Sequence, residues 1–153
     1  MSDRDLNVDY HTAVAYAALM HKGQVDKQGQ PYIIHLMGVS LAGETIEEKI
    51  VGILHDTLED TTATKEDLAV FFGKKVADRV EIVTRRTNEK YRAFIERIIA
   101  SNDYVALKVK YNDLRYNFHN LDKVTELKIR ARLEDKYSIA LDKISMKLAE
   151  FYK

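Results

Sequence analysis

Apolar residues recur along most of the chain at intervals of three and four positions, which is the repeat of an amphipathic helix. The longest such stripe lies near the C-terminal end and consists of Tyr137, Leu141, Ile144, Leu148 and Phe151. Shorter stripes begin at residues 10, 50, 76 and 94. Only one proline and six glycines occur in 153 residues, too few for the many tight turns of an all-β fold. The pattern predicts an all-α globule of about seven to nine helices.

Local signals predict some helix boundaries. Thr64, with Asp67 three residues later, has the spacing of a capping box, and Gly73 is the residue type that ends helices. Residues 23–31 contain two glycines and the only proline, and they are expected to form a polar loop before a second helix that begins near Tyr32. This loop is either a plain connector or the rim of a pocket, because loops beside candidate ligands often line binding sites.

Length and composition narrow the class of protein. We expect residues 1–153 to form a single domain with one hydrophobic core. The chain has no cysteine, which excludes disulfides, thiolate zinc sites and cysteine nucleophiles. The net charge is zero, so neither nucleic acid nor an anionic membrane is an expected partner. The N-terminus lacks the features of a signal peptide, and a cytoplasmic location is expected. No oligomeric state is predicted.

The charges are unevenly distributed along the chain. Residues 1–60 carry 4 Lys and Arg against 10 Asp and Glu, while residues 61–153 carry 20 against 14. An acidic first part suits a bound cation, and a basic remainder suits a ligand that carries phosphate. The expected partner is therefore a small anionic molecule.

One short segment combines residues that could perform chemistry. Residues 50–60 form an apolar helical run that contains His55 and Asp56, followed one turn later by Glu59 and Asp60. Residues four apart share a helix face, so Glu59 should lie over His55 and Asp60 over Asp56. A histidine and a carboxylate can bind one divalent cation, and the two later acids can then handle the proton of its water. An exposed acidic turn at a helix end is the competing interpretation.

Two further residues decide between these interpretations. His35 lies in an apolar helical segment, and Asp113 shares a helix face with Asn117, four residues on. Alone, His35 would be read as an ordinary core histidine. With His55 and Asp56, however, His35 and Asp113 complete a set of two imidazoles and two carboxylates from three helices. Nitrogen and oxygen ligands without sulfur favour Mn²⁺, with Fe²⁺, Zn²⁺ or Co²⁺ as alternatives.

The order of these residues resembles that of the HD phosphohydrolase superfamily, whose members hydrolyse phosphate esters with a metal-bound water. Three segments narrow the resemblance to the hydrolase domains of Rel/Spo-type alarmone enzymes. They are residues 21–35, residues 54–61, and the set of Val109, Lys110, Asp113 and Asn117. The resemblance covers residues 10–120. No synthetase domain is recognised after these motifs, so we expect the resemblance to be greatest to stand-alone small alarmone hydrolases.

The resemblance implies a role for each matching residue. The metal ligands would be His35, His55, Asp56 and Asp113. Glu59 and Asp60 would position and deprotonate the attacking water. Lys27, Lys110 and Asn117 would bind the nucleotide substrate. The implied reaction is removal of the 3′-pyrophosphate from (p)ppGpp, which releases pyrophosphate and GDP or GTP.

Two positions depart from the family's pattern. Asp26 stands where the family usually has an arginine that helps to hold the guanine, and Leu36 stands where it usually has a proline. An aspartate cannot stack as a guanidinium does and would repel phosphate, so an adenine alarmone such as (p)ppApp, or another nucleotide, is an alternative substrate. We expect the change at Leu36 to affect only the start of the helix.

Two other function classes compete with an alarmone hydrolase. One is another HD-family nucleotide phosphohydrolase or phosphatase, which Asp26 keeps open. The other is a non-catalytic nucleotide-binding module, which the complete set of acids and imidazoles argues against. The cluster of Arg85, Arg86, Lys90 and Arg92 around Tyr91 is either a phosphate clamp or a solvated surface, and we expect the surface. His11 and His119 are interpreted as ordinary histidines, and His21 as a motif residue that is not a ligand.

Overall fold

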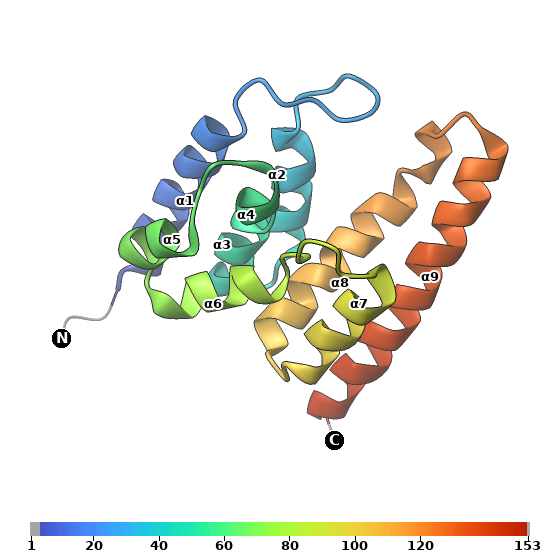
Figure 1. Ribbon diagram of the computed structural model, residues 1–153. Coiled ribbons are helices and arrows are strands. Elements are labelled where there is room, and N and C mark those ends of the chain that lie inside the picture. Colours follow the sequence, from blue (N-terminus) through green and yellow to red (C-terminus); the bar gives the residue numbers. More distant parts are fainter. Residues whose placement is uncertain (1–3, 153) are drawn as a thin grey trace.

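A computed structural model describes residues 4–152, and these residues form nine α-helices, one of them a single turn (Figure 1). Within this range the only pairing of extended segments is an isolated bridge between Val25 and Pro31. The predicted all-α class and the predicted number of helices are therefore confirmed. The helices are α1 (Leu6–Met20), α2 (Ile33–Ala42), α3 (Ile46–Leu54), α4 (Thr57–Asp60), α5 (Lys65–Phe72), α6 (Lys74–Ile82), α7 (Tyr91–Ala100), α8 (Tyr104–His119) and α9 (Leu127–Ala149).

Side-chain caps explain where several helices begin and end. The predicted capping box of Thr64 and Asp67 is present at the start of α5, and a second box joins Thr45 to Glu48 at the start of α3. Each box satisfies backbone N–H groups that have no partner inside the helix. Gly73 ends α5 with a φ of +92°, a conformation that side chains with a Cβ disfavour. The predicted boundaries of this helix are confirmed.

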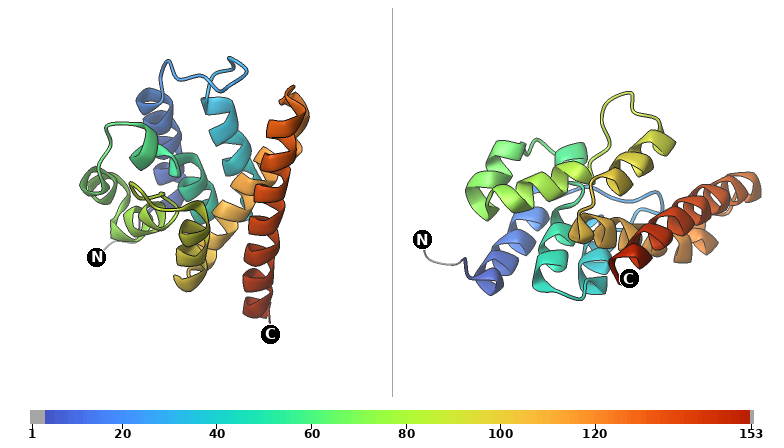
Figure 2. Two further views of the ribbon diagram at one scale, coloured as in Figure 1. Left: turned by 45° about the vertical axis from the view of Figure 1, so that its right-hand side comes forward. Right: turned by 90° about the horizontal axis from the view of Figure 1, so that it is seen from below.

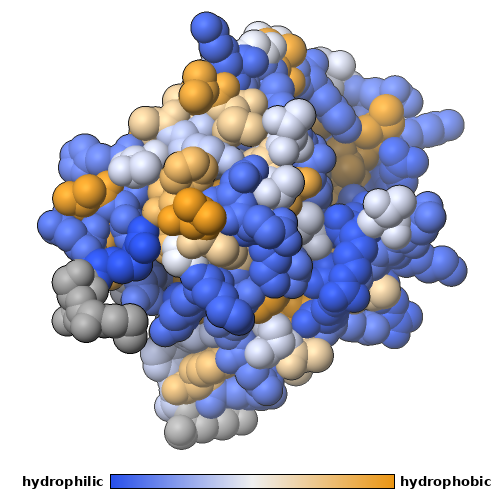
Figure 3. Space-filling view, turned by 60° about the vertical axis from the view of Figure 1, so that its left-hand side comes forward, coloured by the Kyte–Doolittle hydropathy of each residue, from blue (hydrophilic) through white to orange (hydrophobic). Residues whose placement is uncertain are grey.

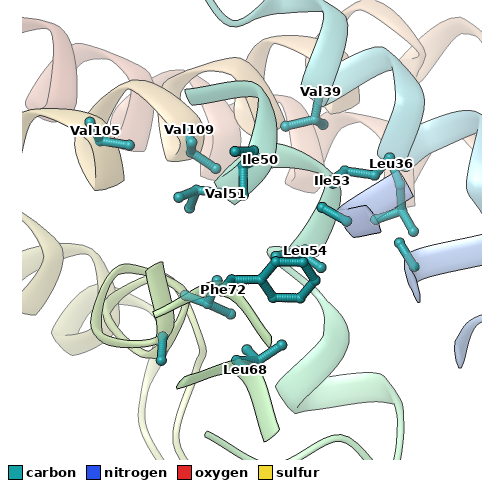
Figure 4. Close-up of a cluster of buried hydrophobic side chains, with 14 residues drawn as sticks. Leu36, Val39, Ile50, Val51, Ile53, Leu54, Leu68, Phe72, Val105 and Val109 are labelled. Carbon is teal, nitrogen blue, oxygen red and sulfur yellow. The ribbon is translucent and has the colours of Figure 1, made fainter. Parts of the chain in front are cut away.

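Helix α8 lies at the centre of the molecule, in contact with α2, α3, α6, α7 and α9. Its two faces belong to different hydrophobic clusters. Val105 and Val109 belong to a cluster with residues of α1, α2, α3, α5 and α6. Figure 4 labels the members from α2, α3, α5 and α8. Leu107 and Leu114 pack instead against α7 and α9. Helix α8 therefore joins the two hydrophobic clusters. Helix α9 runs along one side of the molecule (Figure 2).

Two helical glycines mark places of close approach. A Cβ at Gly52 would lie 3.1 Å from the Cα of Ser40, so α3 and α2 touch backbone to backbone there. A Cβ at Gly38 would lie 2.3 Å from the ring of Tyr116. Glycine at these positions lets α2 pack closely against both α3 and α8.

One prediction about the fold is wrong. Residues 50–60 do not form a continuous helix, because α3 ends at Leu54 and α4 begins at Thr57. Asp56 leaves the helical conformation, with φ −101° and ψ 2°. Side chains compete for the carbonyls that a continuous helix would use, since His55 Nδ1 lies 2.6 Å from the Gly52 oxygen and the Thr57 hydroxyl donates to the Leu54 oxygen. The Asp60 N–H still donates to the Asp56 carbonyl, so Asp60 remains one turn beyond Asp56.

Apolar side chains are also found at the surface. The face in Figure 3 is mostly hydrophilic, with small groups of apolar side chains among charged ones. Scattered exposure of this kind is normal for a folded protein. Among residues 4–152 no helix has both the length and the apolar character needed to cross a bilayer. Leu36, in the first turn of α2, is fully buried in the cluster that includes α3, so it contributes to packing and not only to the helix start.

Candidate metal centre and the cavity around it

The four predicted metal ligands converge from three parts of the fold. His35 comes from α2, His55 and Asp56 from the turn between α3 and α4, and Asp113 from α8. Ligand atoms of His35, His55 and Asp56 all lie within 4.8 Å of one another. Asp113 Oδ1 lies 3.0 Å from His35 Nε2 and 3.5 Å from His55 Nε2. Two imidazoles and two carboxylates thus surround one small volume, as a divalent cation requires.

The orientation of His55 suits a metal ligand. Its Nδ1 lies 2.6 Å from the carbonyl oxygen of Gly52, and a carbonyl can only accept, so Nδ1 carries the proton. In the neutral imidazole that binds a metal, the lone pair is then on Nε2, which lies 3.1 Å from Asp56 Oδ2. This buried Nε2 has no hydrogen-bond partner among the described residues. A histidine held through one nitrogen and open at the other is the usual arrangement in metal sites.

A second layer of contacts orients the two carboxylates. Lys110 Nζ donates to Asp113 Oδ2 at 3.0 Å, which leaves Oδ1 facing the histidines. The Tyr32 hydroxyl donates to Asp56 Oδ2. Burial alone would raise the pKa of Asp113, but the charge of Lys110 and a hydrogen bond from His35 lower it well below its ordinary value. Asp113 therefore remains an anion although it is buried.

The two predicted catalytic acids lie just beyond this cluster. Glu59 lines the cavity next to the candidate ligands, and its Oε1 accepts a hydrogen bond of 2.5 Å from the backbone N–H of Arg85. Asp60 lies at the end of α4 and does not line the cavity, and both acids are exposed. Burial and the neighbouring Asp56 raise the pKa of both carboxyl groups. Glu59 is thus the better placed of the two acids to act as a base on a water in the cavity.

A cavity of about 470 Å³ opens from the ligand cluster, large enough for a nucleotide. The three predicted substrate-binding residues, Lys27, Lys110 and Asn117, all line it. Asn117 Nδ2 lies 3.4 Å from Asp113 Oδ1, one turn along α8, as the spacing predicted. The polar loop before α2 forms part of the rim, which decides between the two interpretations of that loop in favour of a pocket wall.

The side chain of Asp26 has a role that its sequence position did not predict. Its Oδ1 accepts hydrogen bonds of 2.9 Å from the backbone N–H groups of Gln28 and Gln30. The loop closes further through the Gly29 N–H, which donates to the Asp26 carbonyl, with Gly29 at a φ of +83°. Asp26 therefore holds the loop in shape while it also borders the cavity.

Several residues of the cavity were missed by sequence reasoning. Arg85 was expected on a solvated surface, and it is exposed, but it also lines the cavity together with Tyr91. Lys136 of α9 also lines the cavity, and no motif pointed to it. Tyr32 was visible only as part of a motif, without a role. His11 and His119 are exposed and His21 is buried outside the ligand cluster, as predicted for all three.

His21 contacts the site indirectly. Its Nδ1 lies 2.7 Å from the side-chain oxygen of Gln24, and the Gln24 amide donates to the backbone carbonyl of Asp60. This pair ties the end of α1 and the loop after it to the turn that carries Glu59 and Asp60.

Comparison with known proteins identifies relatives of the whole arrangement. A family model described as HD domain matches residues 13–116. The chain is 36% identical over 124 residues to a guanosine-3′,5′-bis(diphosphate) 3′-pyrophosphohydrolase MESH1 of Danio rerio, covering 73% of this chain and 68% of the relative. It is 35% identical over 144 residues to a GTP pyrophosphokinase of Myxococcus xanthus, covering 82% of this chain and 19% of the relative.

The chain spans less than a fifth of the length of the Myxococcus xanthus relative and of some others. A guanosine-3′,5′-bis(diphosphate) 3′-pyrophosphohydrolase of Aquifex aeolicus is 42% identical over 85 residues, which is 53% of this chain and 12% of the relative. A solved structure described as a metazoan orthologue of SpoT that hydrolyses ppGpp superposes with a TM-score of 0.76 at 24% identity, covering 99% of this chain and 97% of that one. At that identity the likeness establishes the fold.

Proposed function

The chain belongs to the HD domain family, and from this premise we propose that it hydrolyses the 3′-pyrophosphate of (p)ppGpp in a metal-dependent reaction. The products would be pyrophosphate and GDP or GTP. Relatives that carry the name guanosine-3′,5′-bis(diphosphate) 3′-pyrophosphohydrolase support this substrate. We propose further that residues 1–153 form one HD-type domain.

The observation that carries the proposal is the convergence of two imidazoles and two carboxylates at one end of a nucleotide-sized cavity. We assign His35, His55, Asp56 and Asp113 as ligands of a divalent cation. The buried His55 Nε2 without a hydrogen-bond partner supports this assignment, because such an atom costs free energy unless a ligand occupies it. The nitrogen and oxygen donors suit Mn²⁺. When bound, the cation would lower the pKa of a water and neutralise phosphoryl oxygens.

The remaining roles belong to the chain's own side chains. Glu59 accepts the proton of the attacking water, a task for which its raised pKa suits it near neutral pH. Asp60, one turn beyond Asp56, adds negative charge that favours this proton transfer. Lys110 keeps Asp113 oriented and ionised. Lys27 and Asn117, at the rim and on α8, bind the nucleotide.

One experiment tests the proposal directly. The purified protein is incubated with Mn²⁺ and a panel of ppGpp, ppApp, NADPH and simple nucleotides, and the products are separated chromatographically. Release of pyrophosphate and GDP from ppGpp supports the proposed reaction. Release of phosphate from simple nucleotides alone would identify another HD-family phosphohydrolase, and binding without turnover of any compound would indicate a nucleotide-binding module.

A further inference from the structure

Three cationic side chains surround one aromatic ring on the side of the cavity formed by α7, α9 and the loop before α7. Lys136 Nζ lies 4.1 Å from the centroid of the Tyr91 ring, the Arg85 guanidinium carbon lies 5.7 Å from it, and Lys110 Nζ lies 6.0 Å from it. All four residues line the cavity that also contains the candidate metal ligands. Cations over a ring face gain from its negative potential, but three of them also repel one another.

The three cations differ in how they are paired. Lys110 is paired with Asp113, and Arg85 Nε donates to the backbone carbonyl of Glu89. Lys136 Nζ has no carboxylate of residues 4–152 within 4.0 Å and no side-chain hydrogen bond. Burial and the charges of Arg85, Lys110 and Lys27 lower its pKa. Lys136 therefore carries a charge that the protein alone does not compensate.

The hydroxyl of Tyr91 provides a second, independent observation. It is buried and makes no hydrogen bond to any described residue. A buried hydroxyl without a partner is uncommon in folded proteins and calls for an explanation. An anion beside Tyr91 would give a partner to this donor and to Lys136 together.

We propose that Lys136, Arg85 and Tyr91 form a second anion subsite of the cavity, separate from the metal centre, that binds the phosphate group at the other end of the substrate. This inference rests on the proposed function, because it takes the metal centre to hold the scissile pyrophosphate. The ligand class is then a nucleotide with phosphate groups at two separate positions. Lys136 lies on α9, outside the matched residues 13–116, so the subsite adds to the site that the family's motifs describe.

A kinetic comparison tests the subsite through substrate structure. Guanosine 3′,5′-bis(diphosphate) is compared with guanosine 3′-diphosphate, which has a 5′-hydroxyl and so lacks the second anionic group. Lys136→Met should raise KM about tenfold or more for the first substrate, the usual value of a hydrogen bond to a charged group. For the second substrate KM should stay near that of the wild type. Lys136→Arg, which restores the charge, should recover most of the loss.

A matched control lies further along the same helix. Lys143 is also cationic and half-buried on α9, but it does not line the cavity. It lines a groove that adjoins the cavity at Tyr91 and Lys136, and its Nζ lies 4.0 Å from Glu96 Oε1. Lys143→Met should leave both KM values unchanged. Circular dichroism shows whether each variant is folded, and Arg85→Met replaces Lys136→Met in the same comparison if the latter does not fold.

A binding measurement separates the subsite from catalysis. Guanosine 5′-diphosphate is titrated calorimetrically into protein kept free of metal with a chelator. Without a cation, the carboxylates of Asp56 and Asp113 repel the phosphates, so binding at the candidate metal centre is disfavoured. The wild type and Lys143→Met should bind equally, and Lys136→Met at least tenfold more weakly. If binding depends on Lys136 but no alarmone is turned over, the subsite is supported and the proposed function is refuted. Turnover of ppGpp with no effect of Lys136→Met on KM or on binding, or equal effects on both substrates, would refute the subsite.

Discussion

The two sides of the cavity are built in opposite ways. The side formed by α2, the α3–α4 turn and α8 carries imidazoles and carboxylates, and Asp113 there lies 3.0 Å from both Lys110 and His35. The side formed by α7, α9 and the loop between α6 and α7 carries cations, of which Lys136 has no carboxylate partner among the described residues. The first side is organised before any ligand arrives, whereas the charges of the second side are compensated only by a bound anion.

The difference also follows the packing of the molecule. The ligand side belongs to the larger hydrophobic cluster around α3, whose central residues are fully buried. The cationic side belongs to the smaller cluster that joins α7 and α9 to α8. Helix α8 carries Asp113 and Lys110 between the two clusters, and so it fixes the distance from one side of the cavity to the other.

The largest effect is expected from variants of the ligand side, which is the side of the cavity that carries the candidate metal ligands. His55→Ala or Asp56→Ala should abolish both Mn²⁺ binding and turnover, because each change removes a donor that no neighbour can replace. Metal content is measured by elemental analysis of the purified variants, with the exposed His11→Ala as the control that should bind about one ion per chain. A variant that keeps full metal content would remove that residue from the ligand set.

The next prediction separates proton transfer from metal binding on the same side. Glu59→Gln keeps the size of the side chain but removes the base, so kcat should fall by roughly 10²–10⁴-fold while metal content stays near that of the wild type. Asp60→Asn should have the smaller effect, since Asp60 does not line the cavity. Nearly full activity of both variants would show that neither acid handles the proton.

The pH dependence of activity provides a second test of Glu59. Burial raises its pKa above the ordinary value of 4.5, so its basic form is lost at a higher pH than for an exposed glutamate. At saturating Mn²⁺, kcat/KM should therefore fall as the pH decreases toward this raised pKa. The residual activity of Glu59→Gln should lack that decline. An identical acid limb in both proteins would assign the decline to another group, such as the histidines.

A smaller effect is expected when the ion pair that supports the loop of the cationic side is removed. Arg97 forms hydrogen bonds of 2.8 Å and 2.9 Å with Glu89, and it also donates to the carbonyls of Ile82 and Thr84, which holds the loop that carries Arg85. Arg97 lowers the pKa of Glu89 to about 2. Glu89→Gln should reduce the free energy of unfolding at neutral pH by about 1.5–3 kcal/mol, the usual range for a hydrogen bond to a charged group.

The sign of the pH effect follows from the lowered pKa. Because Glu89 has an ordinary pKa of 4.5 when unfolded and about 2 when folded, its contribution is complete above pH 4.5 and is lost as the pH falls toward 2. Urea unfolding at pH 7 and near pH 2 measures the difference between the wild type and Glu89→Gln. A difference that does not shrink at low pH would contradict the ion pair as the source of the stabilisation.

The sequence predicted the ligand side far better than the cationic side, for a physical reason. His55 and Asp56 are adjacent in the chain, and Asp113 and Asn117 are one helical turn apart, so local geometry alone brings each pair together. The approach of Lys136 to Tyr91 depends on how α9 packs against α7, which no local spacing expresses. A lysine is moreover one of 24 basic residues and carries no distinctive signal.

The errors of sequence reasoning also have particular causes. Periodicity predicted a continuous helix through residues 50–60. It contains no information on hydrogen bonds from side chains to the backbone, such as those by which His55 and Thr57 compete for backbone carbonyls. The contact of Gly38 with Tyr116 was likewise invisible, although a glycine inside a helix can indicate close packing. Asp26 was interpreted only as a lost arginine, because its bonds to the loop depend on the loop's folded shape.

The smallest expected effect concerns Asp26, in the loop before α2 that forms part of the cavity rim. Asp26→Asn keeps an oxygen that can accept from the N–H groups of Gln28 and Gln30 but removes a negative charge beside the phosphates. A half-exposed charge of this kind is worth about 0.2–1 kcal/mol, so KM for ppGpp should fall by roughly 1.5- to 5-fold. Asp26→Ala removes the charge and the acceptor together, and the loosened loop should cancel this gain.

Asp26→Arg then isolates the effect of the family's usual residue. It adds a planar cation that can stack on a base, but it loses the acceptor that shapes the loop, so its net effect depends on which base the cavity holds. If the natural substrate contains guanine, KM for ppGpp should improve relative to Asp26→Ala, and more than KM for ppApp does. An equal response to both bases would mean that Asp26 acts through the loop and through charge alone. Base selectivity would then come from another part of the cavity.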